Sequence, residues 1–307
     1  MNEVRVSVVM ITYGHERFIA QAIEGVLMQV CNFSVELIIA NDNSPDKTDD
    51  IIQSFLANRT IPPHITIHYT KHSTNLGMMP NFIWALKRAK GQYIALCEGD
   101  DYWTKANKLQ IQVDFMESHP DYIMCCHDRD VVDDNNEVLI HNQQTTKVDK
   151  DTFVQSLVYR NVPFDDVFYT YFVKAKNGDT FLIYRLHQLG ETKYFDLNAA
   201  CYRVSDAGVW SQVGAQKRFE MSMASYNNMI DYYMLLQNRT AVQELQKWKA
   251  EQYLIRSQDL AVNGDQKAAL NSLWQYNKTL WKHNPAWLFK LATIKTNILL
   301  TVQYLKK

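Results

Sequence analysis

Apolar and polar positions alternate in blocks over the first hundred residues. Four short apolar runs have the length of strands: Val6–Ile11, Leu37–Ala40, Ile65–Tyr69 and Tyr93–Cys97. Segments with a helical pattern separate them: Glu16–Gln29, Asp46–Leu56 and Met79–Ala89, the last of which ends at Gly91. The predicted order is therefore β-α-β-α-β-α-β.

The first two runs are almost continuously apolar, which indicates strands covered on both faces, as in a parallel sheet. The alternation predicts an α/β fold with a doubly wound, mostly parallel sheet. In such folds, ligands bind at the carboxyl ends of the strands, near a topological switch point. Polar clusters follow all four predicted strands, at Thr12–Tyr13, Asn41–Ser44, Asn75–Gly77 and Glu98–Asp101.

The pattern changes further along the chain. A helix, a strand and an acidic turn are expected at Leu109–Glu117, Tyr122–Cys126 and Asp130–Asn136, and residues 140–212 give a mixed pattern. Long helices are expected at Gln216–Gln237 and Ala241–Leu260. We therefore expect one domain over residues 1–212 and a helical region over residues 213–307.

Composition narrows the class of protein. The 307 residues are 47% hydrophobic, which is enough for a large core. The 32 basic and 33 acidic residues nearly cancel, so no global field favours nucleic acid as a partner. The five cysteines are odd in number and form no CxxC pair, which is typical of free thiols in a reducing compartment and argues against a zinc site.

The two ends of the chain bear on its location. The first apolar run is too short for a signal peptide, and no apolar stretch approaches the roughly 20 residues that cross a bilayer. We expect a cytoplasmic protein. Residues 282–307 carry five lysines, no acidic residue and an apolar stripe at helical spacing. Such a helix suits peripheral contact with the inner face of the plasma membrane. The apolar stripe is explained equally well by packing against the preceding helices or against a second subunit in a homodimer.

The acidic cluster that begins at Glu98 has two interpretations. Asp100 and Asp101 are oxygen ligands of the kind that Mg²⁺ or Mn²⁺ prefers, with water and phosphate completing the shell. Taken alone, the pair is explained at least as well by a structural role, in which the two acids lie in a turn and cap the next helix. Asp42 also follows an apolar strand, so two strand ends direct carboxylates to one crevice, which favours a site.

Five segments in order resemble the nucleotide-binding half of family 2 glycosyltransferases of the GT-A fold, of the bacterial polysaccharide and glycoconjugate type. They are Val6–Gln29, Glu36–Ser44, Asn75–Gly77 with Asn81, Gly91–Ala95, and Glu98–Gln110. The resemblance covers about the first 120 residues and continues more weakly to residue 212. It implies a nucleotide-sugar donor, a divalent metal (Mn²⁺ or Mg²⁺), and a glycan or lipid-linked glycan as acceptor.

The resemblance also implies roles for single residues. Thr12, Tyr13 and Glu16 would face the nucleotide, and Asp42 would accept a hydrogen bond from the base. Gly14 departs from the family pattern, where Asn is common, and leaves details of this pocket open.

The remaining donor contacts follow in the same way. The rim of the nucleotide pocket would be formed by Asn75, Gly77 and Asn81. Asp101 would bind the metal, with Asp100 on the ribose or on a water ligand. Arg203 and Trp210 resemble a segment that closes over the donor diphosphate, although Arg203 is also compatible with a surface position at a strand end.

Transfer needs a base for the acceptor hydroxyl. Asp165-Asp166, followed by an aromatic run and Gly178, is similar to the family's base motif, so we expect Asp166, or Asp165, in that role. The alternative is that one of the pair caps a helix. Tyr159-Arg160 lies closer to this pair than the aromatic-Arg pair does in the family.

The expected function is therefore an inverting sugar transfer in which the metal stabilises the leaving diphosphate, with a UDP-sugar favoured by analogy. A binding protein of this fold without transfer activity is a second hypothesis. A nucleotidyltransferase is a third, and it fits less well because residues 12–18 lack the Gly-rich basic loop that cradles a triphosphate.

Overall fold

A computed structural model describes residues 3–143, 152–205 and 213–283. The chain divides into two compact units, which are described separately here. The first unit comprises residues 1–173 and 178–212, and the second comprises residues 174–177 and 213–307. The cysteines are all free thiols, as their number and spacing predict.

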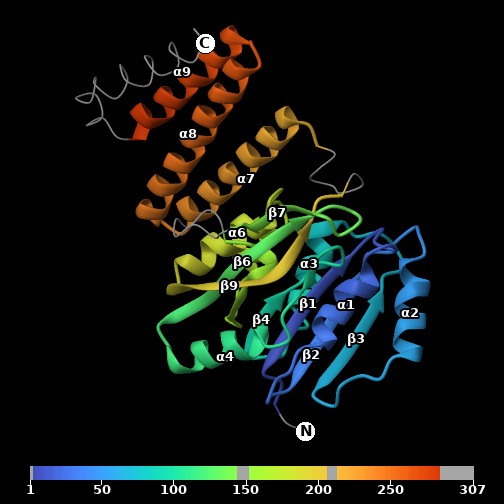
Figure 1. The fold of residues 1–307 in the computed structure, drawn as a ribbon. Coiled ribbons are helices and arrows are strands. Elements are labelled where there is room, and N and C mark those ends of the chain that lie inside the picture. Colours follow the sequence, from blue (N-terminus) through green and yellow to red (C-terminus); the bar gives the residue numbers. More distant parts are fainter. Residues whose placement is uncertain (1–2, 144–151, 206–212, 284–307) are drawn as a thin grey trace. The chain divides into compact units, whose positions relative to one another are not determined.

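One half of the first unit is a parallel sheet with helical crossovers (Figure 1). Its strands lie in the order β3 (Ile65–Lys71), β2 (Val35–Asn41), β1 (Val6–Thr12) and β4 (Tyr93–Leu96), and all three pairings are parallel. The crossovers are α1 (Ile19–Leu27), α2 (Thr48–Asn58) and α3 (Met78–Leu86). The chain adds β2 and β3 on one side of β1 and then returns through α3 to place β4 on the other. The switch point therefore lies between the carboxyl ends of β1 and β4.

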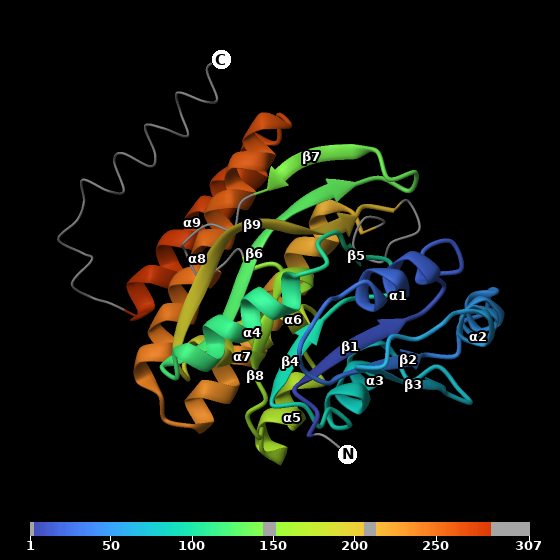
Figure 2. The same ribbon diagram turned by 60° about the horizontal axis from the view of Figure 1, so that its bottom comes forward.

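The other half of the sheet is mixed. It continues from β4 through β8 (Val158–Arg160), β6 (Tyr122–Val132) and β9 (Glu191–Arg203) to β5 (Tyr102–Trp103), with β7 (Val138–Gln143) paired to β6. The connecting helices are α4 (Lys108–Ser118), η1 (Val154–Ser156), α5 (Asp166–Phe172) and α6 (Gly178–His187). Figure 2 shows β6 and β9 side by side, as their parallel pairing requires.

The expected acidic turn over Asp130–Asn136 is partly wrong. Its first three residues belong to β6, where Asp130 pairs with Cys201 and Val132 with Arg203. The turn proper begins at Asp133, whose carboxylate accepts hydrogen bonds from the backbone of Asn135 and Glu137. Strand partners on both edges of β6 outweigh the local turn preference of the acidic residues.

The core of the first unit explains the continuous apolar runs. Side chains from both faces of β1 and β2 are fully or almost fully buried, among them Val8 and Val9 of β1 and Leu37 and Ile38 of β2. Gly25 of α1 lies so close to the backbone of Trp103 that a Cβ would come within 2.8 Å of the Trp103 nitrogen. This close contact fixes α1 against β5, immediately after the acidic cluster.

The second unit is helical. It contains α7 (Ala215–Leu235), α8 (Arg239–Val262) and α9 (Gln266–His283), with Ala250, Leu273 and Tyr276 at the centre of a small apolar cluster. The two long helices expected from the sequence are confirmed within two residues at each end. None of the helices that the structure describes has the length and apolarity needed to cross a membrane. The lysine-rich stretch from 282 lies almost entirely beyond the described residues.

Candidate active site

The acidic cluster lies at the switch point. Carboxylate oxygens of Glu98, Asp100 and Asp101 all lie within 4.8 Å of one another. The turn that carries them is held against the end of β1, because the Gly99 amide donates to the carbonyl of Ile11 at 3.0 Å. A Cβ at Gly99 would come within 2.7 Å of the Thr12 hydroxyl oxygen, so this close approach requires glycine.

Asp101 is the most enclosed member of the cluster, with 1% of its surface exposed. One of its carboxylate oxygens accepts from the backbone amide of Arg203 at 2.8 Å, and the other accepts from the side-chain amide of Gln155. Desolvation, followed by repulsion from Asp100, holds the pKa of Asp101 well above its usual range. Desolvation and the two neighbouring carboxylates also raise the pKa of Glu98.

This set of ligands fits a divalent cation. All three side chains offer oxygen, which Mg²⁺ and Mn²⁺ prefer, and their mutual repulsion would be relieved by a positive ion. Glu98 and Asp100 are only half-buried, so they remain open to an incoming ligand. His15 lies beside the cluster, with its Nε2 3.7 Å from a carboxylate oxygen of Asp100.

A cation of the protein itself also faces the cluster. Arg129, on β6, donates to the Gln155 side-chain oxygen at 2.9 Å and packs over the rings of Phe153 and Tyr202, with its guanidinium carbon 3.9 and 4.3 Å from their centres. Its charge favours ionisation of Asp101. Gln155 therefore links the arginine to the buried carboxylate.

Asp179 is a fourth acid of this site. It lies in the first turn of α6, directly after Gly178, and its side chain is exposed to water. The surrounding protein nevertheless desolvates it enough to raise its pKa, whereas the Arg129 charge acts to lower it. The charge of Asp179 in turn contributes to the raised pKa of Glu98. Asp179 thus interacts electrostatically with both the acidic cluster and the arginine.

Asp165 and Asp166, one of which was expected to be the general base, are not brought to this cluster. β8 runs antiparallel to β4, so it returns the chain to the amino edge of the sheet, where the Asn161 side chain donates to the Gly91 carbonyl at 2.8 Å. The pair follows there, at the start of α5. Asp165 caps this helix by accepting from the Phe168 amide at 2.7 Å, as the alternative interpretation proposed.

Four of the expected nucleotide residues do come together. Asp42 is buried at the end of β2, and its amide donates to the Thr12 carbonyl at 3.0 Å. Its carboxylate accepts from the amides of Leu76 and Gly77 at 2.6 and 2.9 Å. The Asn75 side chain also accepts from Gly77, at 2.9 Å. Asp42 therefore ties the loop before α3 to the end of β1.

Tyr13 and Glu16 follow β1 and are exposed. With 48% of its surface exposed, Tyr13 is free to stack on a ligand ring. Glu16 accepts from the Lys47 amide at 2.9 Å, which joins it to the loop before α2. Between them, Gly14 has a φ of 74°, a conformation that suits glycine, and its amide donates to the hydroxyl of Ser44.

Two further residues that were expected to contact the ligand instead form hydrogen bonds within the protein. The Asn81 side chain is buried, donates to the Ala40 carbonyl at 3.0 Å and contacts His72, so it anchors α3 to β2. Arg203 is 3% exposed and forms four side-chain hydrogen bonds, with partners that include the carbonyl of Asp100 at 3.0 Å. It braces the acidic turn from within. Trp210 lies outside the described residues.

The sequence interpretation missed Arg129, Gln155, Asp179 and His15 as parts of the site. For Asp179 the sequence does contain a signal, because this acid directly follows Gly178 at the start of a helical pattern. Arg129 lies just after the predicted strand Tyr122–Cys126, and Gln155 lies in the mixed segment; only the tertiary fold brings them to Asp101.

Comparison with known proteins supports a family assignment. The model of the family described as glycosyl transferase family 2 matches residues 7–179, more than half of the chain. Over 223 residues the chain is 33% identical to an uncharacterised Mycobacterium tuberculosis protein, covering 69% of this chain and 62% of that one. Over 113 residues it is 35% identical to an Escherichia coli protein named UDP-Glc:alpha-D-GlcNAc-diphosphoundecaprenol beta-1,3-glucosyltransferase WfaP. This match covers 37% of this chain and 41% of that one.

Solved structures share the fold. The crystal structure of S. aureus TarS 1–349 in complex with UDP-GlcNAc superposes with a TM-score of 0.61 at 16% identity, covering 90% of this chain and 82% of that chain. This likeness confirms the predicted α/β GT-A fold. The chain spans 62% of the length of the M. tuberculosis relative.

Proposed function

The chain belongs to glycosyl transferase family 2, and from this premise we propose that it moves a sugar from a nucleoside-diphosphate sugar to a hydroxyl of a glycan or lipid-linked glycan acceptor. The observation that carries the proposal is the position of the acidic cluster. It lies at the carboxyl ends of β1 and β4, beside the loop that Asp42 holds, where α/β sheets bind ligands.

The donor is expected to lie between these two features. Asp42, Asn75 and Gly77 line one side, where Tyr13 is available to stack on the nucleotide base. The carboxylates of the acidic cluster line the other side. UDP is favoured as the nucleotide, because the names of WfaP and of the TarS complex both contain a UDP-sugar. A divalent ion held by Asp101, with Glu98 and Asp100 beside it, would offset the charge of the departing diphosphate.

Asp179 is our preferred base for an inverting transfer. In that reaction the acceptor oxygen loses its proton, bonds to the anomeric carbon, and the bond from that carbon to the diphosphate breaks. The base must lie near the reacting carbon, and Asp179 lies near Glu98 and Arg129 whereas Asp166 lies toward the other edge of the sheet. The raised pKa of Asp179 also suits a proton acceptor.

The alternatives differ in turnover. A binding protein of this fold would hold nucleotide sugars without hydrolysing them, and a nucleotidyltransferase would use a nucleoside triphosphate. Neither is favoured, because the cluster combines a set of metal ligands with a separate, water-exposed carboxylate.

Donor hydrolysis tests the proposal. The purified chain is incubated with UDP-, GDP- and dTDP-sugars plus Mn²⁺, with and without EDTA, and free nucleotide is measured. We expect hydrolysis of one nucleotide class, abolished by EDTA and lowered by about 100-fold or more in Asp101→Asn. Asp121→Asn, which removes an exposed carboxylate at the far end of β6, is the matched control. Hydrolysis that survives both EDTA and Asp101→Asn would contradict the metal role.

The base is tested by transfer at saturating acceptor. Asp179→Asn should lower kcat by about 10²- to 10⁴-fold, the usual contribution of a general base, while nucleotide binding persists. Asp166→Asn should keep kcat near the wild-type value. The opposite result would return the role to Asp166, as the sequence motif first predicted.

A further inference from the structure

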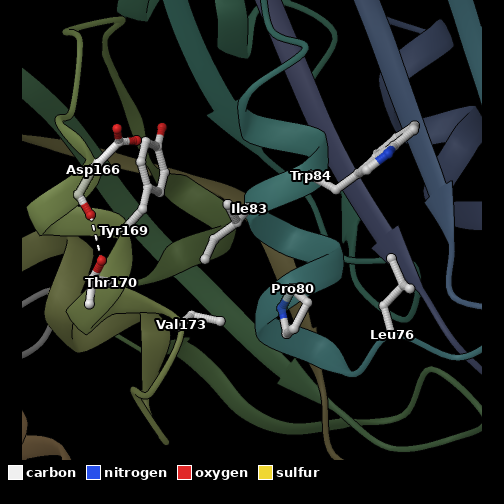
Figure 3. A pocket seen from close by; sticks show the side chains of 8 residues that line it. All are labelled: Leu76, Pro80, Ile83, Trp84, Asp166, Tyr169, Thr170 and Val173. Carbon is white, nitrogen blue, oxygen red and sulfur yellow. Dashed lines mark hydrogen bonds between the residues drawn. The ribbon is translucent and has the colours of Figure 1, made fainter.

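The chain between α5 and α6 leads directly to Asp179. The end of α5 is secured by the Thr170 hydroxyl, which donates to the Asp166 carbonyl at 2.8 Å (Figure 3). Residues 173–177, which we call the α5–α6 connection, follow as turns and irregular backbone, and Asp179 is the second residue of α6. The path of this connection therefore sets the position of the Asp179 backbone.

One hydroxyl group holds the last part of the α5–α6 connection. The amides of Lys176 and Asn177 donate to the Ser225 side-chain oxygen at 3.1 and 3.0 Å. Ser225 lies in α7 with 2% of its surface exposed, and it belongs to the same compact unit as residues 174–177. A hydroxyl oxygen has two lone pairs, and here both accept from the connection. Ser225 therefore supplies the partner that two backbone amides outside any helix or strand require.

The residue between this connection and the proposed base is also fixed. A Cβ at Gly178 would lie 2.8 Å from the Cε of Met79, and closer still to its Sδ. Met79 is 5% exposed and lies in the first turn of α3, just after Gly77, whose amide donates to Asp42. Gly178 therefore packs closely on α3, and a larger residue there would displace the start of α6.

The Asp179 carboxylate depends on its own backbone for its direction. Thr180, the next residue, donates to it from its amide at 2.7 Å and from its hydroxyl at 3.5 Å. Among the described residues, no other hydrogen bond reaches this carboxylate. A shift of the backbone at the start of α6 would therefore carry the carboxylate with it.

We infer that Ser225 is a positioning residue for the general base. By holding the amides of Lys176 and Asn177, it fixes the start of α6 and so the place from which the Asp179 carboxylate reaches the acceptor hydroxyl. Ser225 does not touch the reacting atoms and acts through the backbone alone. The inference rests on the proposed function, because it requires Asp179 as the base.

Two other buried serines of the second unit show what a structural hydroxyl does there. Ser257 and Ser272 donate to the carbonyls of Ala269 and Tyr253, each at 2.8 Å, and both bonds join α8 to α9. The Ser225 oxygen instead accepts, and its partners lie outside these helices. It is therefore the approach to α6 that the Ser225 oxygen secures.

Hydrogen exchange measures this anchor without turnover. Exchange is followed by NMR at the amides of Lys176 and Asn177 in the full chain. Ser225→Ala removes the acceptor, so both amides should exchange about tenfold faster, whereas Ser225→Thr keeps a hydroxyl and should restore protection. Ser257→Ala, the matched control, should leave these amides unchanged. Unchanged exchange in Ser225→Ala would overturn the inference.

Donor hydrolysis measures the effect on the base. The donor is the member of the UDP-, GDP- and dTDP-sugar panel that the chain hydrolyses with Mn²⁺, and water takes the place of the acceptor hydroxyl. Ser225→Ala should lower kcat about 10- to 100-fold, because a displacement of about 1 Å can cost that much, while KM stays within about twofold. Ser225→Thr should recover most of the rate, and Ser257→Ala should match the wild type.

A double variant separates positioning from a general loss of structure. In Asp179→Asn the carboxylate is gone, so adding Ser225→Ala should cause little further loss. A merely structural role of Ser225 would lower kcat by the same factor in both backgrounds, and that result would overturn the inference. Urea denaturation of each variant checks that it is folded under the conditions of the assay.

The two proposals fail in different ways. Full hydrolysis in Asp179→Asn would remove the base from the proposed function and would overturn the positioning role with it. Loss of hydrolysis in Asp179→Asn together with a normal rate in Ser225→Ala would leave the base in place and overturn the positioning role alone.

Discussion

At the scale of single residues, Lys108 shows how an ionisable side chain is accommodated in the core. It is the first residue of α4 and has no exposed surface. Its ammonium group donates to the Gln112 side chain at 2.8 Å and lies 4.1 Å from the ring centre of Trp103. Burial lowers its pKa from 10.5 to about 7.

The stability of the protein should therefore depend on pH through this lysine. Between pH 7 and pH 10 the unfolded chain binds a proton at Lys108 that the folded chain does not, so the free energy of unfolding rises with pH. Lys108→Met removes this pH dependence but leaves the side-chain oxygen of Gln112 without its donor. Relative to wild type, the variant should lose about 3 kcal/mol between pH 7 and pH 9.5.

Urea denaturation at the two pH values measures this difference. Lys105→Met, which changes an exposed lysine three residues earlier, is the control and should show no such trend. A difference between Lys108→Met and wild type that is independent of pH would mean that the lysine keeps its proton throughout this range.

The positions of site residues were predictable from the sequence where a strand end supplied the context. Asp42 and Asp101 follow apolar runs, and the structure places both at the carboxyl edge of the parallel strands. Asp166 was chosen from a local pattern of acids and aromatic residues. That pattern does not reveal that β8 returns to the amino edge of the sheet, so it carries no information on how far Asp166 lies from Asp101.

At the scale of elements, the parallel half of the sheet was predicted within a few residues for each strand. Each strand there is an apolar block closed by a turn, so pattern and structure agree. In the mixed half, α4 and the first part of β6 were predicted. β8 and β9 were not, because β8 is three residues long and β9 has an uneven burial pattern. Pairing across more than 60 residues, as between β6 and β9, leaves no local signature.

Gly91, between α3 and β4, is an element-scale feature that can be tested. A Cβ there would lie 2.5 Å from the Ser7 nitrogen and 2.7 Å from the Val6 carbonyl carbon, both backbone atoms of β1. Gly91→Ala should lower the free energy of unfolding by about 1–3 kcal/mol, since strands must shift to admit the methyl group.

The matched control is Gly214→Ala, where nothing lies within 4 Å of an added Cβ and φ is −58°. Its change should be less than about 1 kcal/mol. Chemical denaturation of both variants gives the comparison, and equal losses would show that the contact at Gly91 relaxes freely.

At the scale of the whole molecule, the two units differ in what the sequence could say about them. The first carries the polar strand ends that led to the family resemblance. The second is a set of helices whose described residues supply none of the acids of the candidate site. Peripheral membrane contact or dimerisation through residues 282–307 stays a prediction from lysine and apolar spacing alone.

Asp101 depends on partners that follow it far along the chain. Its two carboxylate oxygens are held by Gln155 and by the Arg203 amide, the latter 102 residues later. A ribosome adds about 5–20 residues per second, so β1 to β4 are synthesised several seconds before Arg203, whose amide binds the acidic turn. The nascent chain should therefore form the loop that Asp42 holds before the acidic cluster has all its hydrogen-bond partners. A chain stalled before residue 203 would expose an unbraced acidic turn to the quality-control machinery of the cell.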